Sequence, residues 1–470
     1  MIEKNLGAVN VGGVNSYLQS LDYQYNDQGW ITKLNQESLG GTNIALPTSG
    51  CTPALPNPGT YTYQANPDPN DLFYIEFKYD AASFPNITGL PSNLQKAGNI
   101  AQIAYRVRGR DKQAYNYSYD FLNRMLNSTH YTVSSANAAT ASNLYNENLT
   151  YDSRGNILTL NRQGYYTSGA TCAYNTIDNL TYNYSANTNK LNTITESASA
   201  TYKNFGFNPG AGGVGYTYDV NGNLKSDSYK GITNITYNFL NLPSKIEWST
   251  TKSIEFVYTA AGEKLAKTVK TGTTTNYIQH YAQGIEYNSA SGLNRRVESI
   301  YHGEGRFFNT NTGTTTPTYR TEFSIKDHLG NARVTFTDLN ANGKIDVTNN
   351  ATTNEIIQEN HYYAFGMAHE GPWLMNHSSK DNNYLYNYKE LNADHDLKWY
   401  DYGARFYDAV IGRWHVVDRF TEKYLNISSY SYAANLVLNV VDVNGDSLKV
   451  NLTDNNSKKA FNAFLELRQV

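Results

Sequence analysis

Tyrosines two residues apart, followed by a polar turn and an aliphatic residue, form the dominant pattern along this chain. Tyr216 and Tyr218 would share one face of a strand, because alternate side chains of a strand point the same way. The segment 219–222 (Asp-Val-Asn-Gly) supplies turn chemistry, with short polar side chains and a glycine that accepts a positive φ. Leu224 begins the next strand. The pattern therefore predicts a β-hairpin with one aromatic face.

The same pattern recurs between residues 25 and 265. Successive copies from Tyr119 start 32, 33, 34, 21 and 19 residues apart, and such recurrence is typical of repeat architectures. The copies are Tyr25–Ile31, Tyr119–Leu126, Tyr151–Leu158, Tyr184–Leu191, Tyr218–Leu224, Phe239–Ile246 and Tyr258–Leu265. They are degenerate: aspartate is missing after Tyr184, Phe239 and Tyr258, and the turn glycine is replaced by Asn123 or Pro243.

A single hairpin cannot bury its own aromatic face, whereas stacked hairpins bury it jointly. We therefore predict that Tyr151, Tyr184, Tyr218 and Tyr258 line successive strands around one interior. A set of unrelated hairpins in a sandwich is the alternative. The fold class predicted is all-β.

Two segments interrupt the repeats, and one follows them. Residues 40–70 hold six of the 12 prolines and predict a loop or insertion, because proline cannot donate to a sheet. Residues 132–142 are rich in Ser, Ala and Thr and predict a hairpin tip. Apolar residues at helical spacing predict one amphipathic helix over 457–467, after a break at 444–446.

Composition narrows the classes of function. The 470 residues carry a net charge of −3, so nothing indicates the basic surface that nucleic acid requires. The 41 tyrosines favour extended structure, and mean hydropathy is −0.58 with only 17% charged residues, unlike a charge-rich disordered chain. The sequence begins without the apolar core of a signal peptide, and no apolar run is long enough to span a membrane. We expect the tail of a longer chain.

The two cysteines, Cys51 and Cys172, leave two readings open. They could form a disulfide in an oxidising compartment or stay as two thiols. No metal-ligand spacing accompanies them.

The last third of the chain holds six sequence blocks in a fixed order. They are Asp327–Arg333 (DHLGNAR), Tyr363–Gly366, Tyr384–Leu391, Trp399–Asp408 (WYDYGARFYD), Gly412–Trp414 and His415–Asp418. These blocks resemble the core domain of RHS (rearrangement hotspot) proteins, and the repeats resemble the YD repeats of RHS proteins, the Tc toxin C-component and teneurins. The core-motif residues are Asp327, His328, Leu329, Gly330, Asn331, Arg333, Trp399, Tyr400, Asp401, Tyr402, Gly403, Arg405, Tyr407, Asp408, Gly412, Arg413 and Trp414.

The resemblance implies a hollow spiral β-shell that carries a variable C-terminal toxic domain. It divides the chain into a repeat array (1–320), a core domain that closes one end (321–446) and the start of a truncated variable region (447–470). The implied function is a non-catalytic scaffold, secreted or at the cell surface. Its partners would be its own effector region, further N-terminal repeats and export machinery. An adhesion or carbohydrate-binding protein is the alternative, and a self-cleaving aspartyl protease is a third.

Asp418 and Asp442 are the candidate catalytic pair. In shell-forming relatives two such aspartates, each in a DPxG-type motif, form an intramolecular aspartyl protease, and carboxylates that share a proton can activate water. Here Arg419 and Val443 replace both prolines, and Asp446 occupies the expected cut. We therefore expect no efficient self-cleavage. Two aspartates that end strands are the structural alternative, with Arg405 and Arg413 as candidate partners.

A second candidate is a calcium loop at 338–349. Asp338, Asn340, Asn342 and Asp346 match the alternating oxygen ligands of an EF-hand-type loop, but Asn349 stands where a glutamate is expected. A polar hairpin tip is the alternative, and no other cofactor is expected. The histidines His328, His361 and His415 are expected to be hydrogen-bonded shell residues. The aromatic cluster around Trp399 and Trp414 is expected to be core rather than a sugar site.

Overall fold

The computed structural model of the chain is almost entirely β-structure. It describes residues 2–11, 14–35, 71–79, 84, 86–92, 95, 98–168, 171–210, 214–290, 295–311, 316–350, 352–373, 380–423 and 427–450. These residues form 31 strands, five short 3₁₀-helices and no α-helix, which confirms the all-β prediction. The Pro-rich segment 40–70, Cys51 and the expected helix at 457–467 lie outside the described residues.

Twenty-five strands in three antiparallel sheets form a wall, and all but β8, which pairs only with β7, follow one another in chain order. The first sheet contains β1 (Ile2–Val11), β2 (Val14–Tyr25), β3 (Ile31–Leu34), β4 (Phe73–Lys78), β5 (Gln102–Val107), β6 (Lys112–Tyr119), β7 (Met125–Val133), β8 (Ala139–Ala141), β9 (Glu147–Tyr151), β10 (Ile157–Ser168), β11 (Thr171–Tyr184) and β12 (Leu191–Glu196). A two-stranded sheet contains β13 (Tyr216–Tyr218) and β14 (Leu224–Asp227). The third sheet contains β15 (Asn234–Tyr237), β16 (Pro243–Ser249), β17 (Lys252–Tyr258), β18 (Lys264–Thr271), β19 (Thr274–Ala282), β20 (Ile285–Ala290), β21 (Arg296–His302), β22 (Gly305–Asn309), β23 (Tyr319–Lys326), β24 (Ala332–Phe336) and β25 (Ile356–Glu359).

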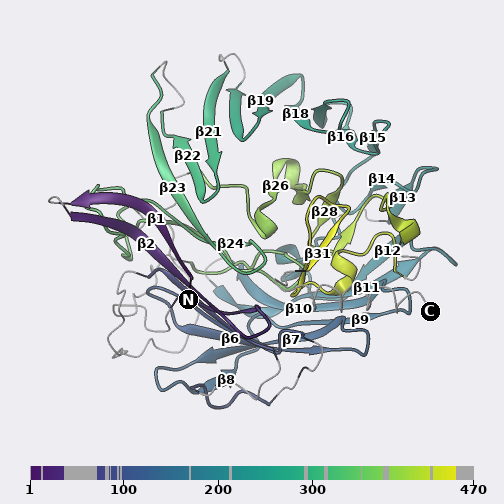
Figure 1. The fold of residues 1–470 in the computed structure, drawn as a ribbon. Coiled ribbons are helices and arrows are strands. Elements are labelled where there is room, and N and C mark those ends of the chain that lie inside the picture. The colour runs from purple at the N-terminus through teal and green to yellow at the C-terminus, as the bar shows by residue number, and fades with distance from the viewer. Residues whose placement is uncertain are drawn as a thin grey trace.

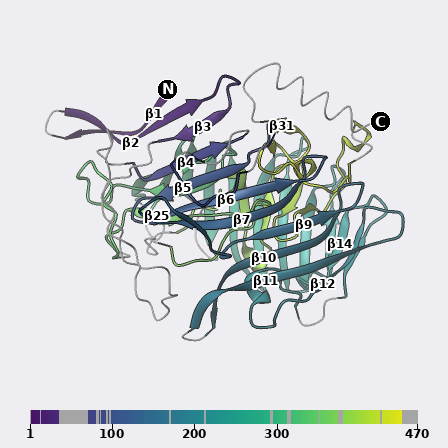
Figure 2. The same cartoon turned by 90° about the horizontal axis from the view of Figure 1, so that it is seen from below.

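The wall curves into a ring and meets itself (Figure 1). Lys4 of β1 forms a 2.5 Å ion pair with Glu304, beside β22. The ring of Phe77 in β4 lies 4.5 Å from that of His328, which follows β23. Figure 2 shows β4 to β12 as one continuous slanted surface of this ring. The N-terminal strands and the strands near residue 330 therefore close one revolution.

The repeat turns share one hydrogen-bond pattern. In the copy that follows Tyr151, the Asp152 carboxylate accepts the backbone N–H groups of Arg154 and Asn156 at 2.9 and 2.8 Å. Gly155 then adopts a φ of +82°, which a glycine reaches without steric cost. A break in strand register falls at or beside the tyrosine of this hairpin and of other copies. The turn therefore requires an oxygen acceptor and one residue that tolerates a positive φ.

A tyrosine hydroxyl ties most of the repeats to the preceding one. Tyr151 donates to the carbonyl of Met125 at 2.7 Å, and Tyr184 donates to the carbonyl of Ile157 at 2.7 Å. Each acceptor is the aliphatic residue that follows the preceding turn. Among the described residues seven tyrosines make such a bond, at positions 79, 119, 151, 184, 237, 258 and 362. This link explains why tyrosine marks each copy.

The sixth copy starts at Tyr237, not at Phe239. The Tyr237 hydroxyl donates to the carbonyl of Leu224 at 2.7 Å, as the repeat tyrosines do, whereas Phe239 is 79% exposed. Asn241, with a φ of +58°, occupies the turn position that the sequence pattern assigned to Pro243. Asparagine tolerates this region better than other non-glycine residues, so the copy keeps its turn. The prediction for this copy was wrong by two residues.

The repeat tyrosines at 151, 184, 218 and 258 end β9, β11, β13 and β17, and all four are partly buried against the main core. This confirms the predicted common interior. The expected hairpin tip at 132–142 is a tight turn that joins β7 to β8.

An inner segment, here defined as residues 361–450, fills the ring (Figure 1). Its strands are β26 (Glu390–Asn392), β27 (Trp399–Asp401), β28 (Phe406–Asp408), β29 (Arg413–Trp414), β30 (Val440–Asp442) and β31 (Leu448–Val450). Tyr182 of β11 donates to the carbonyl of Ile411 at 3.1 Å, and Lys264 of β18 pairs with Asp401 at 2.6 Å. The inner segment therefore contacts distant parts of the wall.

Part of the inner segment covers the rim formed by the repeat turns. Asn435 donates to the carbonyl of Gly155, and Tyr430 donates to the carbonyl of Gly222, at 2.8 and 2.7 Å. Arg413 donates to the carbonyl of Asn189 at 2.7 Å. The three acceptors belong to three successive repeat turns. The residues near 413–439 therefore close this rim. The proposed boundary at 320/321 falls inside β23, whose sheet continues through β25.

We predict that the hydroxyl link stabilises the wall. Tyr151→Phe should lower the free energy of unfolding by about 1–2 kcal/mol, because the Met125 carbonyl loses its partner in a buried position. Tyr17→Phe is the matched control, since Tyr17 is half exposed and should change stability by less than about 0.5 kcal/mol. Urea denaturation of both variants measures the difference. Equal stabilities would contradict the role of the link.

Candidate functional site

The block Asp327–Arg333 is one more repeat turn. The Asp327 carboxylate accepts the N–H groups of Leu329 and Asn331 at 3.0 and 3.1 Å, and Gly330 has a φ of +80°. The ring of His328 contacts the carbonyl of Leu438 in the inner segment at 2.9 Å. Arg333 lies over the rings of Phe73 and Tyr105 in β4 and β5. This block therefore contacts both the N-terminal strands β4 and β5 and the inner segment, at the point where the ring closes.

Asn387 connects that block to the aromatic block. Its side-chain N–H donates to the carbonyl of Leu329 at 2.9 Å, and its side-chain oxygen accepts the hydroxyls of Tyr402 and Tyr432 at 2.6 and 2.5 Å. Sequence reasoning did not single out Asn387. Its φ of +48° and its place between two tyrosines are the only local signals of a special role.

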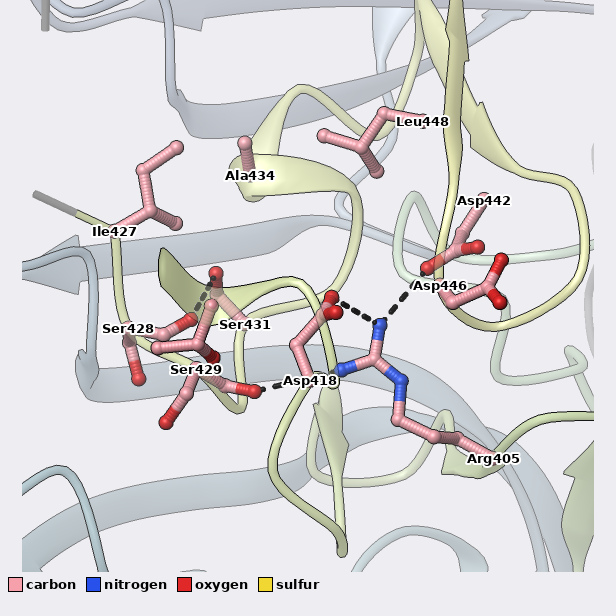
Figure 3. Close-up of a pocket in the computed structure, with 11 residues that line it drawn as sticks. Arg405, Asp418, Ile427, Ser428, Ser429, Ser431, Ala434, Asp442, Asp446 and Leu448 are labelled. Atoms are coloured by element: carbon pink, nitrogen blue, oxygen red, sulfur yellow. Dashed lines mark hydrogen bonds and ion pairs between the residues drawn. The ribbon is translucent and has the colours of Figure 1, made fainter. Parts of the chain in front are cut away.

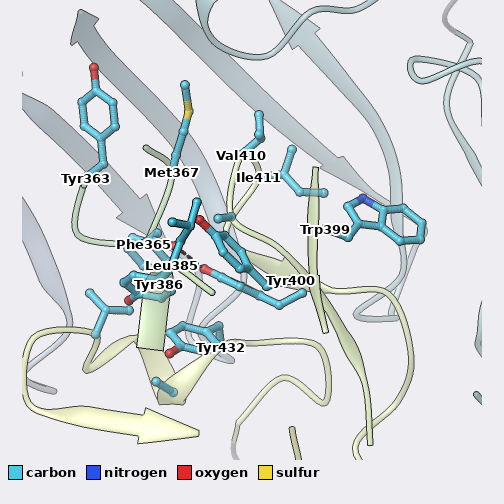
Figure 4. Packing of buried hydrophobic residues seen from close by; sticks show 14 of the residues in the cluster. Tyr363, Phe365, Met367, Leu385, Tyr386, Trp399, Tyr400, Val410, Ile411 and Tyr432 are labelled. Carbon is cyan, nitrogen blue, oxygen red and sulfur yellow. Dashed lines mark hydrogen bonds between the residues drawn. The ribbon is translucent and has the colours of Figure 1, made fainter. Parts of the chain in front are cut away.

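The aromatic cluster is interior. Trp399, Tyr400, Tyr407 and Trp414 are each at most 2% exposed. Figure 4 shows Phe365, Tyr386, Tyr400 and Tyr432 gathered in the core beside Val410 and Ile411. The Trp399 indole donates to Asp408 at 2.9 Å, and the Tyr407 hydroxyl donates to the carbonyl of Phe365 at 2.7 Å. Rings that are buried in this way cannot stack on a sugar, so the expectation of a core is confirmed.

The glycines of the core motif occupy positions that need them. Gly412 has a φ of +65°, and a Cβ there would lie 3.0 Å from both Ile157 and Phe365. Gly403 has a φ of +102° in the turn between β27 and β28. Asp401 accepts the N–H of Gly403 at 2.9 Å and also pairs with Lys264 of the wall. These residues shape the inner segment rather than a binding surface.

The structure brings Asp418 and Asp442 together on one arginine (Figure 3). Nη2 of Arg405 contacts Asp418 Oδ2 at 2.7 Å and Asp442 Oδ2 at 3.2 Å. Nε of Arg405 also donates to the carbonyl of Gly445. The predicted proximity of the two aspartates is therefore present, with a guanidinium between them.

Two other arginines near this pair have different partners. Arg419 pairs with Asp446. Arg413 contacts Tyr184 and the carbonyl of Asn189 and does not contact either aspartate of the pair in the described structure. Of the two arginines predicted as partners of the aspartates, only Arg405 contacts them in the described structure.

Burial dominates the electrostatics of the site. It raises the pKa of the Asp442 carboxyl, with Asp418 acting in the same direction and Arg405 opposing it. Burial also lowers the pKa of Arg405, while Asp418 and Asp442 oppose that change. The pair borders a cavity of about 30 Å³, with Ser428, Ser429 and Ser431 on its wall. That volume holds one or two water molecules.

The loop at 338–349 is organised by a glutamate outside it. The buried Glu355 carboxylate accepts the N–H groups of Leu339 and Asp346, both at 2.7 Å. The side chains of Asn340 and Asn342 both donate to Asp346, at 2.9 and 3.0 Å. No group of three or more His, Cys, Asp or Glu side chains within the described ranges is arranged to hold a metal ion. These bonds are internal to a polar loop that joins β24 to β25.

Sequence reasoning missed a buried charge centre at Arg162. This residue has no exposed surface, and it pairs with Glu147 at 2.8 Å and Asp178 at 3.1 Å on the flanking strands β9 and β11. It also donates to the carbonyl of Val410 in the inner segment at 2.7 Å. The apolar alternation of β10 gave no signal for this role, because its partners lie in other elements.

We compared the chain with family models, curated proteins and solved structures, and only solved structures are similar to it. No family model and no curated protein matches the sequence. The crystal structure of TcdB2-TccC3 is similar with a TM-score of 0.54 and 15% identity, over 94% of this chain and 20% of that chain. The crystal structure of TcdB2-TccC3-TEV is similar with a TM-score of 0.53 and 16% identity, over 94% of this chain and 20% of that chain. The structure of a mutant Photorhabdus luminescens Tc holotoxin pore is similar with a TM-score of 0.50 and 16% identity, over 93% of this chain and 21% of that chain.

The chain thus has an RHS/YD-repeat-like shell fold, as the sequence blocks and repeats indicated. It spans about a fifth of the length of the chains that it matches. No helix among the described residues is long and apolar enough to cross a membrane.

We predict that Arg405 is required for stability. Arg405→Met should cost about 3–5 kcal/mol, because Asp442 is 1% exposed and would be left as an unpaired buried charge. The double variant Arg405→Met/Asp442→Asn should recover part of this loss, since it removes the stranded charge. Thermal and urea unfolding measure both. If Arg405→Met left the free energy of unfolding almost unchanged, the prediction would be wrong, and solvent would be screening the charge of Asp442.

We also predict that calcium leaves the protein unchanged. The melting temperature of chelated protein should stay constant when calcium is added to millimolar concentration, because Asp346 and Glu355 already accept bonds from the loop. A calcium-dependent rise in melting temperature that disappears in Asp338→Asn would instead establish a metal site.

Proposed function

We propose that this chain is part of an RHS-type toxin-complex shell, in which it acts as a non-catalytic scaffold and closes one end. The observation that carries the proposal is the cover over the repeat-turn rim, where Arg413, Tyr430 and Asn435 bind three successive turns. A segment that caps a wall of hairpins is suited to seal a compartment. The similarity of the fold to TccC3-containing structures is consistent with this role.

The partners of such a scaffold would be other parts of the same assembly. The chain covers about a fifth of the structures it resembles, so further repeat strands are the natural extension of the wall. The sequence beyond Asp446 would lead into a variable effector region. We propose a secreted or cell-surface location and bacterial export machinery as a further partner, on the resemblance to RHS proteins alone.

The adhesion and carbohydrate-binding alternative has weaker support. It needs aromatic rings that face solvent, whereas Trp399, Tyr400 and Trp414 are buried and the repeat tyrosines pack on the core. Saturable binding of a glycan to the purified chain would be the observation that favours it.

The self-cleavage alternative conflicts with the position of Arg405. A catalytic dyad needs two carboxyls that share one proton. The Arg405 guanidinium contacts both carboxylates and lies between them, which opposes a proton shared directly from one to the other. At the expected cut, Asp446 is buried and paired with Arg419. We therefore propose that the pair anchors strand β30 to Arg405 and Asp418 within the inner segment and does not hydrolyse the chain.

We predict that the purified chain stays intact. Intact-mass spectrometry after several days at mildly acidic pH should give one species at 52.7 kDa. Mild acid is the stringent condition, because it favours a singly protonated pair. The Asp442→Asn variant is the control and should give the same result.

A product that ends near Asp446 in the wild type, and is absent from Asp442→Asn, would overturn the non-catalytic proposal. The chain would then be a self-processing protease.

A further inference from the structure

Three buried histidines lie where the wall meets the inner segment. His130 comes from wall strand β7, and His361 and His369 come from the chain just after β25. All three are at most 5% exposed. None belongs to the repeat turns or to the Asp418–Asp442 pair.

The three imidazoles form a continuous stack with aromatic rings. His369 stacks on Tyr145 with ring centres 4.1 Å apart, and Tyr145 meets His130 edge-on at 5.5 Å. The ring centre of His369 also lies 6.5 Å from that of His361, whose ring centre lies 4.5 Å from that of Trp373. The stack therefore joins wall strand β7 to residues 361–373 of the inner segment.

The polar surroundings favour neutral imidazoles. Both ring nitrogens of His369 are buried and have no hydrogen-bond partner among the described residues. His130 is bonded to the Ser142 hydroxyl through Nδ1. Nε2 of His361 forms a 2.9 Å hydrogen bond with the Glu359 carboxylate. Nδ1 of His361 accepts a 3.0 Å hydrogen bond from the Arg333 guanidinium. An added proton on His369 would thus be a buried charge without a counterion.

Three arginines lie near the stack, and each is paired with carboxylates: Arg110 with Glu359, Arg162 with Glu147 and Asp178, and Arg333 with Asp327. Arg110 and Arg333 face His361, and Arg162 and Arg333 act on His369. Glu359 is the carboxylate that contacts the cluster, and it is already shared with Arg110. The neighbouring tyrosines at 105, 115, 145 and 363 are neutral below pH 10. These surroundings oppose a second positive charge.

We propose that His130, His361 and His369 form an acid-sensitive latch between the wall and the inner segment. At neutral pH the uncharged rings pack the two parts together. Protonation places cations in a dry, arginine-rich contact and separates the parts. The latch adds a regulated opening to the scaffold, and it holds whether or not the scaffold role is correct.

The direction of the pH effect follows from the histidine pKa values. Burial lowers the pKa of His130 to about 3 and that of His361 to about 4, and it lowers the pKa of His369 well below its usual range. The unfolded or opened state, with a pKa near 6.5, binds more protons in acid. The stabilisation is therefore complete above about pH 6.5 and is lost as the pH falls toward 4.

Hydrogen exchange measured by mass spectrometry tests the latch on the full chain. Peptides covering 125–133 and 361–373 should lose protection between pH 6.5 and 4, after correction for intrinsic exchange rates. In His369→Phe the ring packing stays and the titrating group is removed. The pH of half-protection should then fall by about 0.5 unit or more, because fewer protons drive opening.

His395→Gln is the matched control. His395 also joins the inner segment to the wall, at the carbonyl of Lys270, but lies outside the stack. Its variant should keep the wild-type pH of half-protection in the two peptides. If His369→Phe does not fold at pH 7.5, His130→Phe carries the same test.

Retention of protection to pH 4 in the wild type would overturn the proposal. An unchanged midpoint in a folded His369→Phe or His130→Phe protein would overturn it as well.

Discussion

The structure depends on Arg162, a guanidinium with no exposure to solvent, held between two carboxylates and two backbone carbonyls. Glu147 and Asp178 come from the wall strands on either side, and Val410 comes from the inner segment. A buried charge that loses its partners costs several kcal/mol. The wall therefore cannot separate from the inner segment at this point without stranding a charge. The pair Lys264 and Asp401 places a similar constraint on the opposite part of the wall.

The repeat tolerates its own degeneracy because it needs little from each residue. An oxygen acceptor at the turn can come from Asp152, Asn238 or Thr259, and a positive φ can come from Gly155 or Asn241. The tyrosine is the stricter requirement, since its hydroxyl must span from one hairpin to the next. Loss of aspartate in a copy therefore leaves the wall continuous, whereas the aromatic position persists.

Local patterns in the sequence predicted the local structure well. Turn positions, strand alternation and the buried aromatic block near Trp399 were all visible, because each depends on residues close together in the chain. The error at Phe239 arose where the aromatic pattern was ambiguous by two residues. Arg162, Asn387 and Glu355 were not predicted, because their partners are set by tertiary contacts that no local pattern encodes. The Arg405 bridge was only partly foreseen for the same reason.

The Arg162 centre and the histidine stack respond to acid in opposite ways. Burial raises the pKa values of Glu147 and Asp178, so the folded state gains protons there in mild acid and is not weakened by them. The pKa of Glu390 is lowered to about 2, although burial opposes the change, because Lys264 and Lys267 outweigh it. Its stabilising contribution is lost only below about pH 4.5. Between pH 6.5 and 4.5 the histidines are thus the groups whose protonation favours opening. An acid loss of protection in that interval, localised to residues 125–133 and 361–373, would report on the histidine contact between them.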